Sequence, residues 1–129
     1  MVPMVGNYSS ESRLAFVTGA TGFVGGRLVS LLLADGWRVR ALVRSEERAS
    51  SLSDKGVQLV QGDLSASMSQ LQTWMEGADV VFHLAALYRF GVWNTASMVE
   101  TNVEGTRRVL QSAREAGVSR LVHCSTIGC

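Results

Sequence analysis

The last seven residues, HCSTIGC at 123–129, gather five side chains that can do chemistry. A histidine, two cysteines, a serine and a threonine could form a metal site, a redox pair, part of a catalytic site or an ordinary strand end. His123 and Cys124 are adjacent on an extended segment, so their side chains point to opposite faces and cannot share a metal without distortion. The spacing to Cys129 matches no zinc motif. We therefore expect no metal site here.

The stretch VTGATGFVGG, residues 17–26, offers a different chemistry, because its useful groups are backbone amides. Gly19, Gly22 and Gly25 fall between an apolar run that predicts a strand and a segment that predicts a helix. A helix N-terminus presents N–H groups to an anion, and glycines let a pyrophosphate approach them. No Gly-Lys-Ser/Thr follows, so the turn is not a P-loop. The pattern favours dinucleotide binding over a turn that serves packing alone.

Strand and helix patterns alternate along the chain and supply the elements that must position these groups. Predicted strands cover 14–19, 37–44, 57–63, 79–86 and 119–125, and predicted helices cover 22–35, 45–56, 65–78 and 94–116. Strands that are mostly continuous apolar runs indicate a parallel sheet between helices. Right-handed crossovers then give a doubly wound α/β Rossmann fold of five strands over 13–129, after a loose tail at 1–12.

Local signals refine the ends and faces of these helices. We expect Ser45 to cap the second helix and Gly36, Gly56 and Gly117 to end three of the helices. The longest helix should carry an apolar side formed by Val99, Val103, Thr106, Leu110 and Ala113. We expect His83, in the middle of an apolar strand, to be a packed or hydrogen-bonded residue rather than a ligand.

Composition excludes several classes of protein. The net charge is +1 and the cations are scattered, which argues against a nucleic-acid binder. The apolar runs are far shorter than the roughly 20 residues of a membrane span. The start of the chain does not resemble a signal peptide, and two cysteines then suggest thiols in a reducing cytoplasm.

Five motifs, in order, resemble the extended short-chain dehydrogenase/reductase family, in particular its NAD(P)-dependent sugar epimerase/dehydratase and dihydroflavonol-reductase-like members. They are TGATGFVG at 18–25, GDL at 62–64, HLAA at 83–86, NVEGT at 102–106 and HCSTIG at 123–128. The resemblance covers about residues 13 to 129. It implies that two further strands and a substrate domain would follow, so we expect an incomplete domain whose fifth strand forms a sheet edge, marginally stable and prone to self-association.

The resemblance implies cofactor contacts at several positions. Asp63 should accept a hydrogen bond from the adenine amino group, with Leu64 beside the ring, and Ala85 and Ala86 should line the cofactor near the ribose. Asn102 should be mainly structural. The implied contacts in the glycine-rich turn are Gly19, Thr21, Gly22, Phe23, Val24 and Gly25.

Arg44 ends the second predicted strand, where an acidic residue would bind the ribose of NAD and an arginine suits the 2′-phosphate of NADP. A guanidinium binds phosphate with two parallel hydrogen bonds. Arg44 could equally be a solvated surface residue, with Glu46 or Glu47 reaching the ribose. The position favours NADP over NAD.

The resemblance also implies hydride transfer between the nicotinamide and a carbon that bears a hydroxyl or carbonyl, on a nucleotide sugar or a related alcohol or ketone. It assigns the catalytic hydroxyl, which hydrogen-bonds the substrate oxygen, to Thr126, with Ser125 as its neighbour or as the alternative. The family's Tyr-x-x-x-Lys pair is absent, because Ser12 and Val92 stand four residues after Tyr8 and Tyr88.

We therefore expect this chain to be inactive by itself, as the cofactor-binding part of an epimerase, dehydratase or reductase. A homodimer is a further expectation. The alternative is a non-catalytic NAD(P)-binding sensor. Tyr88, Arg89 and Trp93 could touch substrate or anchor a surface loop.

Overall fold

Five parallel strands form one sheet in the computed structural model, which describes residues 13–84 and 95–123. The spatial order is β3-β2-β1-β4-β5, and every neighbouring pair is parallel. The strands are β1 Leu14–Thr18, β2 Arg38–Val43, β3 Gln58–Gln61, β4 Val80–His83 and β5 Arg120–His123. The predicted five-stranded, doubly wound fold is confirmed.

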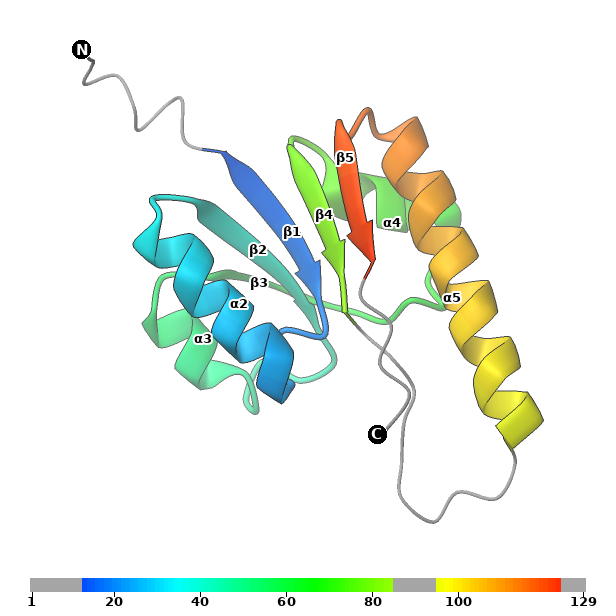
Figure 1. Ribbon diagram of the computed structural model, residues 1–129, viewed down its shortest axis with the longest axis horizontal. Helices are drawn as coiled ribbons and strands as arrows, with labels where there is room; N and C mark the ends of the chain where they lie inside the picture. The colour runs from blue at the N-terminus through cyan, green and yellow to red at the C-terminus, as the bar shows by residue number, and fades with distance from the viewer. Residues whose placement is uncertain (1–12, 85–94, 124–129) are drawn as a thin grey trace.

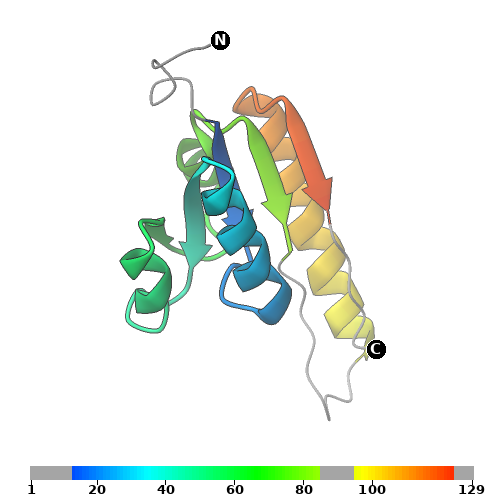
Figure 2. The same cartoon turned by 60° about the vertical axis from the view of Figure 1, so that its left-hand side comes forward.

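Helices cover both faces of this sheet (Figure 1). They are α2 Phe23–Ala34, α3 Ser50–Asp54, α4 Met68–Met75 and α5 Thr95–Glu115. Helices α2 and α3 pack on one face and α4 and α5 on the other, which Figure 2 shows from a second direction. Each of the strands β1 to β4 is therefore followed by a crossover helix, the connection that parallel strands require.

Strand β1 lies at the centre, and all five of its residues are buried. Because side chains alternate along a strand, Ala15 and Val17 join the core under α2 and α3. Leu14 and Phe16 join the second core, under α4 and α5. Among the described residues, the outer strands β3 and β5 each pair with one neighbouring strand, and both are more exposed than β1.

Glycines with positive φ angles end all four helices, three of them as predicted; the fourth is Gly77 after α4, with a φ of 83°. Gly36, Gly56 and Gly117 have φ angles of 89°, 95° and 82°, in the left-handed region that side chains rarely adopt. After α2, the Trp37 amide donates to the Leu32 carbonyl at 2.9 Å and the Gly36 amide to the Leu33 carbonyl at 3.1 Å, which is a Schellman motif. Each helix therefore stops where a strand must begin.

Two helix predictions are wrong in detail. Helix α3 covers only Ser50–Asp54, because Ser45 accepts a hydrogen bond from the Arg48 amide at 3.2 Å in a separate turn before the helix. In α5, Leu110 is 50% exposed, whereas Val109 and Ala113 are buried. The buried side is rotated because α5 packs on α4, where Ser112 donates to Met68 Sδ at 3.7 Å.

Candidate functional site

The predicted site residues follow the carboxyl ends of neighbouring strands. Gly19 follows β1, Arg44 follows β2, and Asp63 comes after β3. The chain runs from β1 to β2 and β3 on one side and then crosses from β3 to β4 on the other side of β1, so the strand order reverses at β1. Ligands of doubly wound sheets bind at this switch point, outside the carboxyl ends of the strands.

The structure requires a glycine at two of the three predicted positions in the first turn, and for a different reason at each. Gly19 has a φ of 80°, so the turn itself requires it. A Cβ on Gly25 would lie 2.0 Å from the Gly19 carbonyl oxygen, so the contact between helix and turn requires it. A Cβ on Gly22 would lie 3.5 Å from that same oxygen, an ordinary contact. Nothing among the described residues near Gly22 requires a glycine there.

Gly22 is also the N-cap of α2, and it has no side chain to accept from the amides of the first turn. Those amides have no partners within the helix, and the dipole adds positive charge at this end. The first turn carries no acidic residue. Thr21 and Val24 are exposed beside it. The arrangement can therefore bind an anion; the side chain of Phe23 lies outside the part of the chain that the structure describes.

Arg44 and Asp63, predicted to bind the two ends of the adenosine, lie side by side. Arg44 Nε is 3.6 Å from Asp63 Oδ2, and the side chains are 78% and 51% exposed. Asp63 Oδ1 accepts from the Ser65 amide at 3.0 Å, which fixes the carboxylate in a short turn. An exposed pair of this kind is weak and screened by salt, so either side chain remains available to a ligand.

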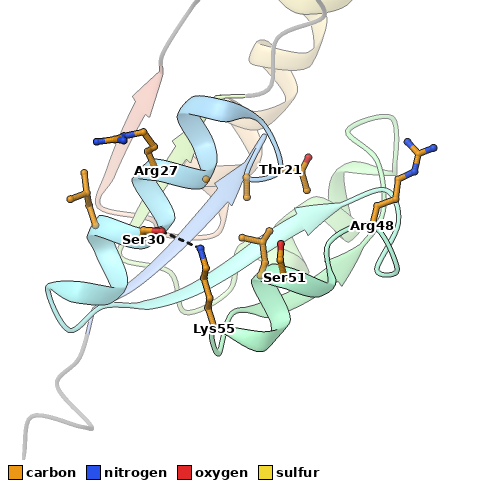
Figure 3. Close-up of a pocket in the computed structure, with 10 residues that line it drawn as sticks. Thr21, Arg27, Ser30, Arg48, Ser51 and Lys55 are labelled. Carbon is orange, nitrogen blue, oxygen red and sulfur yellow. Dashed lines mark hydrogen bonds between the residues drawn. The ribbon is translucent and has the colours of Figure 1, made fainter.

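Sequence reasoning missed a cavity of about 540 Å³ between α2 and α3 (Figure 3). Its wall includes Thr21 of the glycine turn and three cations, Arg27, Arg48 and Lys55. Lys55 reaches from the end of α3 to α2, where its ammonium donates to Ser30 Oγ at 3.3 Å. In the sequence, this cavity could have been suspected only from Arg48, a second cation four residues after Arg44.

A buried polar contact joins the ends of β1 and β4. Thr18 Oγ1 and His83 Nδ1 lie 2.7 Å apart, and both residues are 1% exposed. The Leu84 amide donates to the Thr18 carbonyl at 3.1 Å. Burial, with a smaller effect from the stacked His123 ring, lowers the pKa of His83 to about 4. His83 is thus a packed histidine with a partner, as predicted.

Several predicted residues lie outside the described residues. They are Ala85, Ala86, Tyr88, Arg89, Trp93, Cys124, Ser125, Thr126 and Cys129. Asn102 lies on α5, and its side chain is not described. Within residues 13–84 and 95–123, no helix is long and apolar enough to cross a membrane, and no three His, Cys, Asp or Glu side chains form a metal-binding group.

A parallel sheet in this order, with a three-glycine turn between its first strand and first helix, defines a Rossmann-type α/β domain. The chain belongs to the NAD dependent epimerase/dehydratase family, whose profile matches residues 15–129. The predicted resemblance is confirmed.

Curated relatives include a 4-hydroxy-2-methyl-3-oxo-4-farnesyl-3,4-dihydroquinoline-1-oxide ketoreductase of Stigmatella aurantiaca, 45% identical over 86% of this chain and 33% of the relative. A sterol demethylase protein B of Methylococcus capsulatus is 39% identical over 87% of this chain and 34% of the relative. The chain thus spans about a third of the length of these relatives.

Solved structures share the fold. The protein gox2253 is 39% identical with a TM-score of 0.77, over 89% of this chain and 34% of that one. MoeE5, in complex with UDP-glucose and NAD, is 31% identical with a TM-score of 0.67, over 87% and 36%. Yeast methylglyoxal/isovaleraldehyde reductase Gre2, complexed with NADPH, is 25% identical with a TM-score of 0.75, over 88% and 37%. Similar proteins therefore include one solved with NAD and one with NADPH.

Proposed function

We propose that residues 13–129 form a nicotinamide-dinucleotide-binding domain, with 1–12 as a tail, and that the dinucleotide lies across the carboxyl ends of the strands. The pyrophosphate contacts the turn and first helical amides at Gly19 and Thr21 to Gly25. Asp63 and Leu64 contact the adenine, and Ala85 and Ala86 the ribose. The observation that carries the proposal is the glycine at position 22, because a Cβ there would fit the protein. Since Gly22 is the N-cap of α2, we infer that a side chain there would hinder the approach of a pyrophosphate to the free amides of the helix.

The same proposal favours NADP over NAD. Arg44 is largely exposed, so its guanidinium can turn from Asp63 to a 2′-phosphate. Arg48, on the same connection, lines the cation-rich cavity beside Thr21. These charges favour a ligand with an additional phosphate at this end of the site.

Titration of the chain with NADPH and NADH tests this proposal. The wild-type chain should bind NADPH more tightly, and Arg44→Asp should shift the ratio of the two Kd values toward NADH by about tenfold. Arg38→Asp, on the opposite end of β2, is the matched control and should leave that ratio unchanged. An unchanged ratio in Arg44→Asp would remove the assignment of Arg44, and absence of binding to either dinucleotide would remove the proposal itself.

For the protein as a whole we propose an oxidoreductase. The nicotinamide would supply or accept a hydride at a carbon bearing a hydroxyl or carbonyl. Thr126, with Ser125, would hydrogen-bond the substrate oxygen. The names of the relatives, a ketoreductase and an aldehyde reductase among them, support carbonyl reduction and give no support to a non-catalytic sensor. A cytoplasmic location and a homodimer stay predictions.

In a protein extending to the length of these relatives, Thr126→Val should lower kcat for ketone reduction by about a hundredfold while the Kd for NADPH stays the same. An unchanged kcat would exclude Thr126 from the reaction.

A further inference from the structure

We propose that Arg108 of α5 is a positioning residue for the segment 62–66, and that it thereby sets the selectivity of Asp63 for the adenine base. The inference rests on the proposed function, because Asp63 is taken there as the acceptor for the adenine amino group. It adds a residue 45 positions further along the chain, whose hydrogen bonds go to the carbonyls of Leu64 and Ala66.

Arg108 binds the main chain of two residues that follow Asp63, Leu64 and Ala66. Its Nε donates to the Leu64 carbonyl at 2.9 Å, and its Nη2 donates to the Ala66 carbonyl. The guanidinium is partly buried, so these bonds are sheltered from water. One planar group thus joins two carbonyls and fixes their separation.

The bonds matter because the sheet no longer holds this segment. The Gly62 amide donates to the Val43 carbonyl at 2.9 Å, which is the end of the β3 ladder. Beyond it, the Ser65 amide donates to Asp63 Oδ1 and the Ala66 amide to the Asp63 carbonyl, both at 3.0 Å. This small turn carries the carboxylate, and Arg108 is the side chain that ties its carbonyls to a long helix.

Helix α5 also approaches Leu64 directly. A Cβ on Gly105 would lie 3.6 Å from Leu64 Cδ1, an ordinary contact, so the side chain of Leu64 lies beside the helix one turn before Arg108. Side chain and main chain of Leu64 are thus both set by α5. An acceptor that must meet one amino group loses selectivity when it shifts by about 1 Å.

Arg107 offers a matched comparison. It stands next to Arg108 on the same helix, but its side chain is 67% exposed and pairs with Glu104 at 3.4 Å. Removing its charge changes the helix surface and leaves the segment 62–66 untouched. Lysine at position 108 keeps the charge but cannot hold two carbonyls in a fixed plane.

The test is the ratio of Kd values for NADPH and for its hypoxanthine analogue, in which a carbonyl replaces the adenine amino group. The wild-type chain should prefer NADPH by about tenfold. Arg108→Met should bring the ratio close to one, Arg108→Lys should give an intermediate ratio, and Arg107→Met should keep the wild-type ratio. A merely structural role would weaken both ligands equally and leave the ratio unchanged, which would overturn the inference, as would a wild-type ratio of one.

Amide hydrogen exchange separates this inference from the proposed function. Arg108→Met should speed exchange at Ser65 and Ala66 and leave the amides of β1 unchanged. If the wild-type chain binds neither dinucleotide, the proposed function fails and exchange decides the positioning role alone. Unchanged exchange at both amides would then overturn it.

Discussion

The turn after β1 and the segment 62–66 after β3 both lie at the carboxyl ends of the strands, but different contacts determine their conformations. The turn is shaped by the absence of side chains, because Gly25 lets α2 approach the Gly19 carbonyl and Gly19 takes a positive φ. The segment 62–66 is shaped by groups that other elements supply. Trp74 of α4 packs on Gly62, and Arg108 of α5 binds the carbonyls of Leu64 and Ala66.

This difference has a consequence for folding and binding. The turn depends on steric contacts within seven residues, so it can form as soon as β1 and α2 pack together. The segment needs α4 and α5 in place, because its partners lie about 10 to 45 positions further along the chain. Substitutions should therefore act locally in the first region and at a distance in the second.

The largest effect should come from Gly25→Ala. The added Cβ would lie 2.0 Å from a backbone oxygen that cannot move without opening the turn. We expect the free energy of unfolding to fall by about 3 kcal/mol in urea titrations. Gly26→Ala is the control, since its Cβ would lie 3.8 Å from the Ala20 carbonyl oxygen, and it should gain up to about 1 kcal/mol of helix propensity. Equal stability of the two variants would contradict the steric account of the turn.

A smaller loss should follow Gly62→Ala, because the clash is with a side chain. The Cβ would lie 2.2 Å from Trp74 Cη2, and an indole ring can tilt. We expect a loss of about 2 kcal/mol. In a double-mutant cycle measured by urea unfolding, Gly62→Ala should be nearly neutral in the background of Trp74→Leu. Additive losses would show that the ring does not hold the segment 62–66.

A third effect depends on pH and concerns the residue before the turn, Thr18, whose partner is His83. Burial lowers the pKa of His83 to about 4, so the folded protein keeps the ring neutral while the unfolded chain takes up a proton near pH 6.5. Stability should therefore fall as pH drops from about 6.5 toward 4, by up to about 1.4 kcal/mol per pH unit.

Asparagine at position 83 keeps an acceptor near Thr18 and does not titrate. In His83→Asn, the free energy of unfolding measured from pH 7 to pH 5 should lose this slope. A slope equal to that of the wild-type chain would assign the pH dependence to other groups.

The two regions also differ in how far the sequence predicted them. The alternation of strands and helices, the glycine turn and the helix ends at Gly36, Gly56 and Gly117 follow from local patterns, and the structure agrees. The motif GDL marked the segment after β3, but nothing near it indicates Arg108, which reads as one of two adjacent surface cations. Its role depends on how α5 packs, and the same packing reversed the prediction for Leu110.

The cavity between α2 and α3 was missed for a similar reason. Arg48 and Lys55 are seven positions apart in a polar stretch, and Thr21 lies far from them in the sequence. The fold brings all three to the wall of one cavity. The expected roles of Thr126, Ser125, Ala85 and Ala86 stay predictions, since these residues lie outside the described part of the chain.

The most direct test of the central claim is the Kd for NADPH of Gly22→Ala, measured beside its thermal midpoint. A Cβ at this position has room in the protein, so the midpoint should stay within a few degrees of the wild type. The same Cβ should hinder the pyrophosphate and raise the Kd by about tenfold or more, which corresponds to about 1.4 kcal/mol. An unchanged Kd at an unchanged midpoint would contradict the account of this turn as the pyrophosphate site.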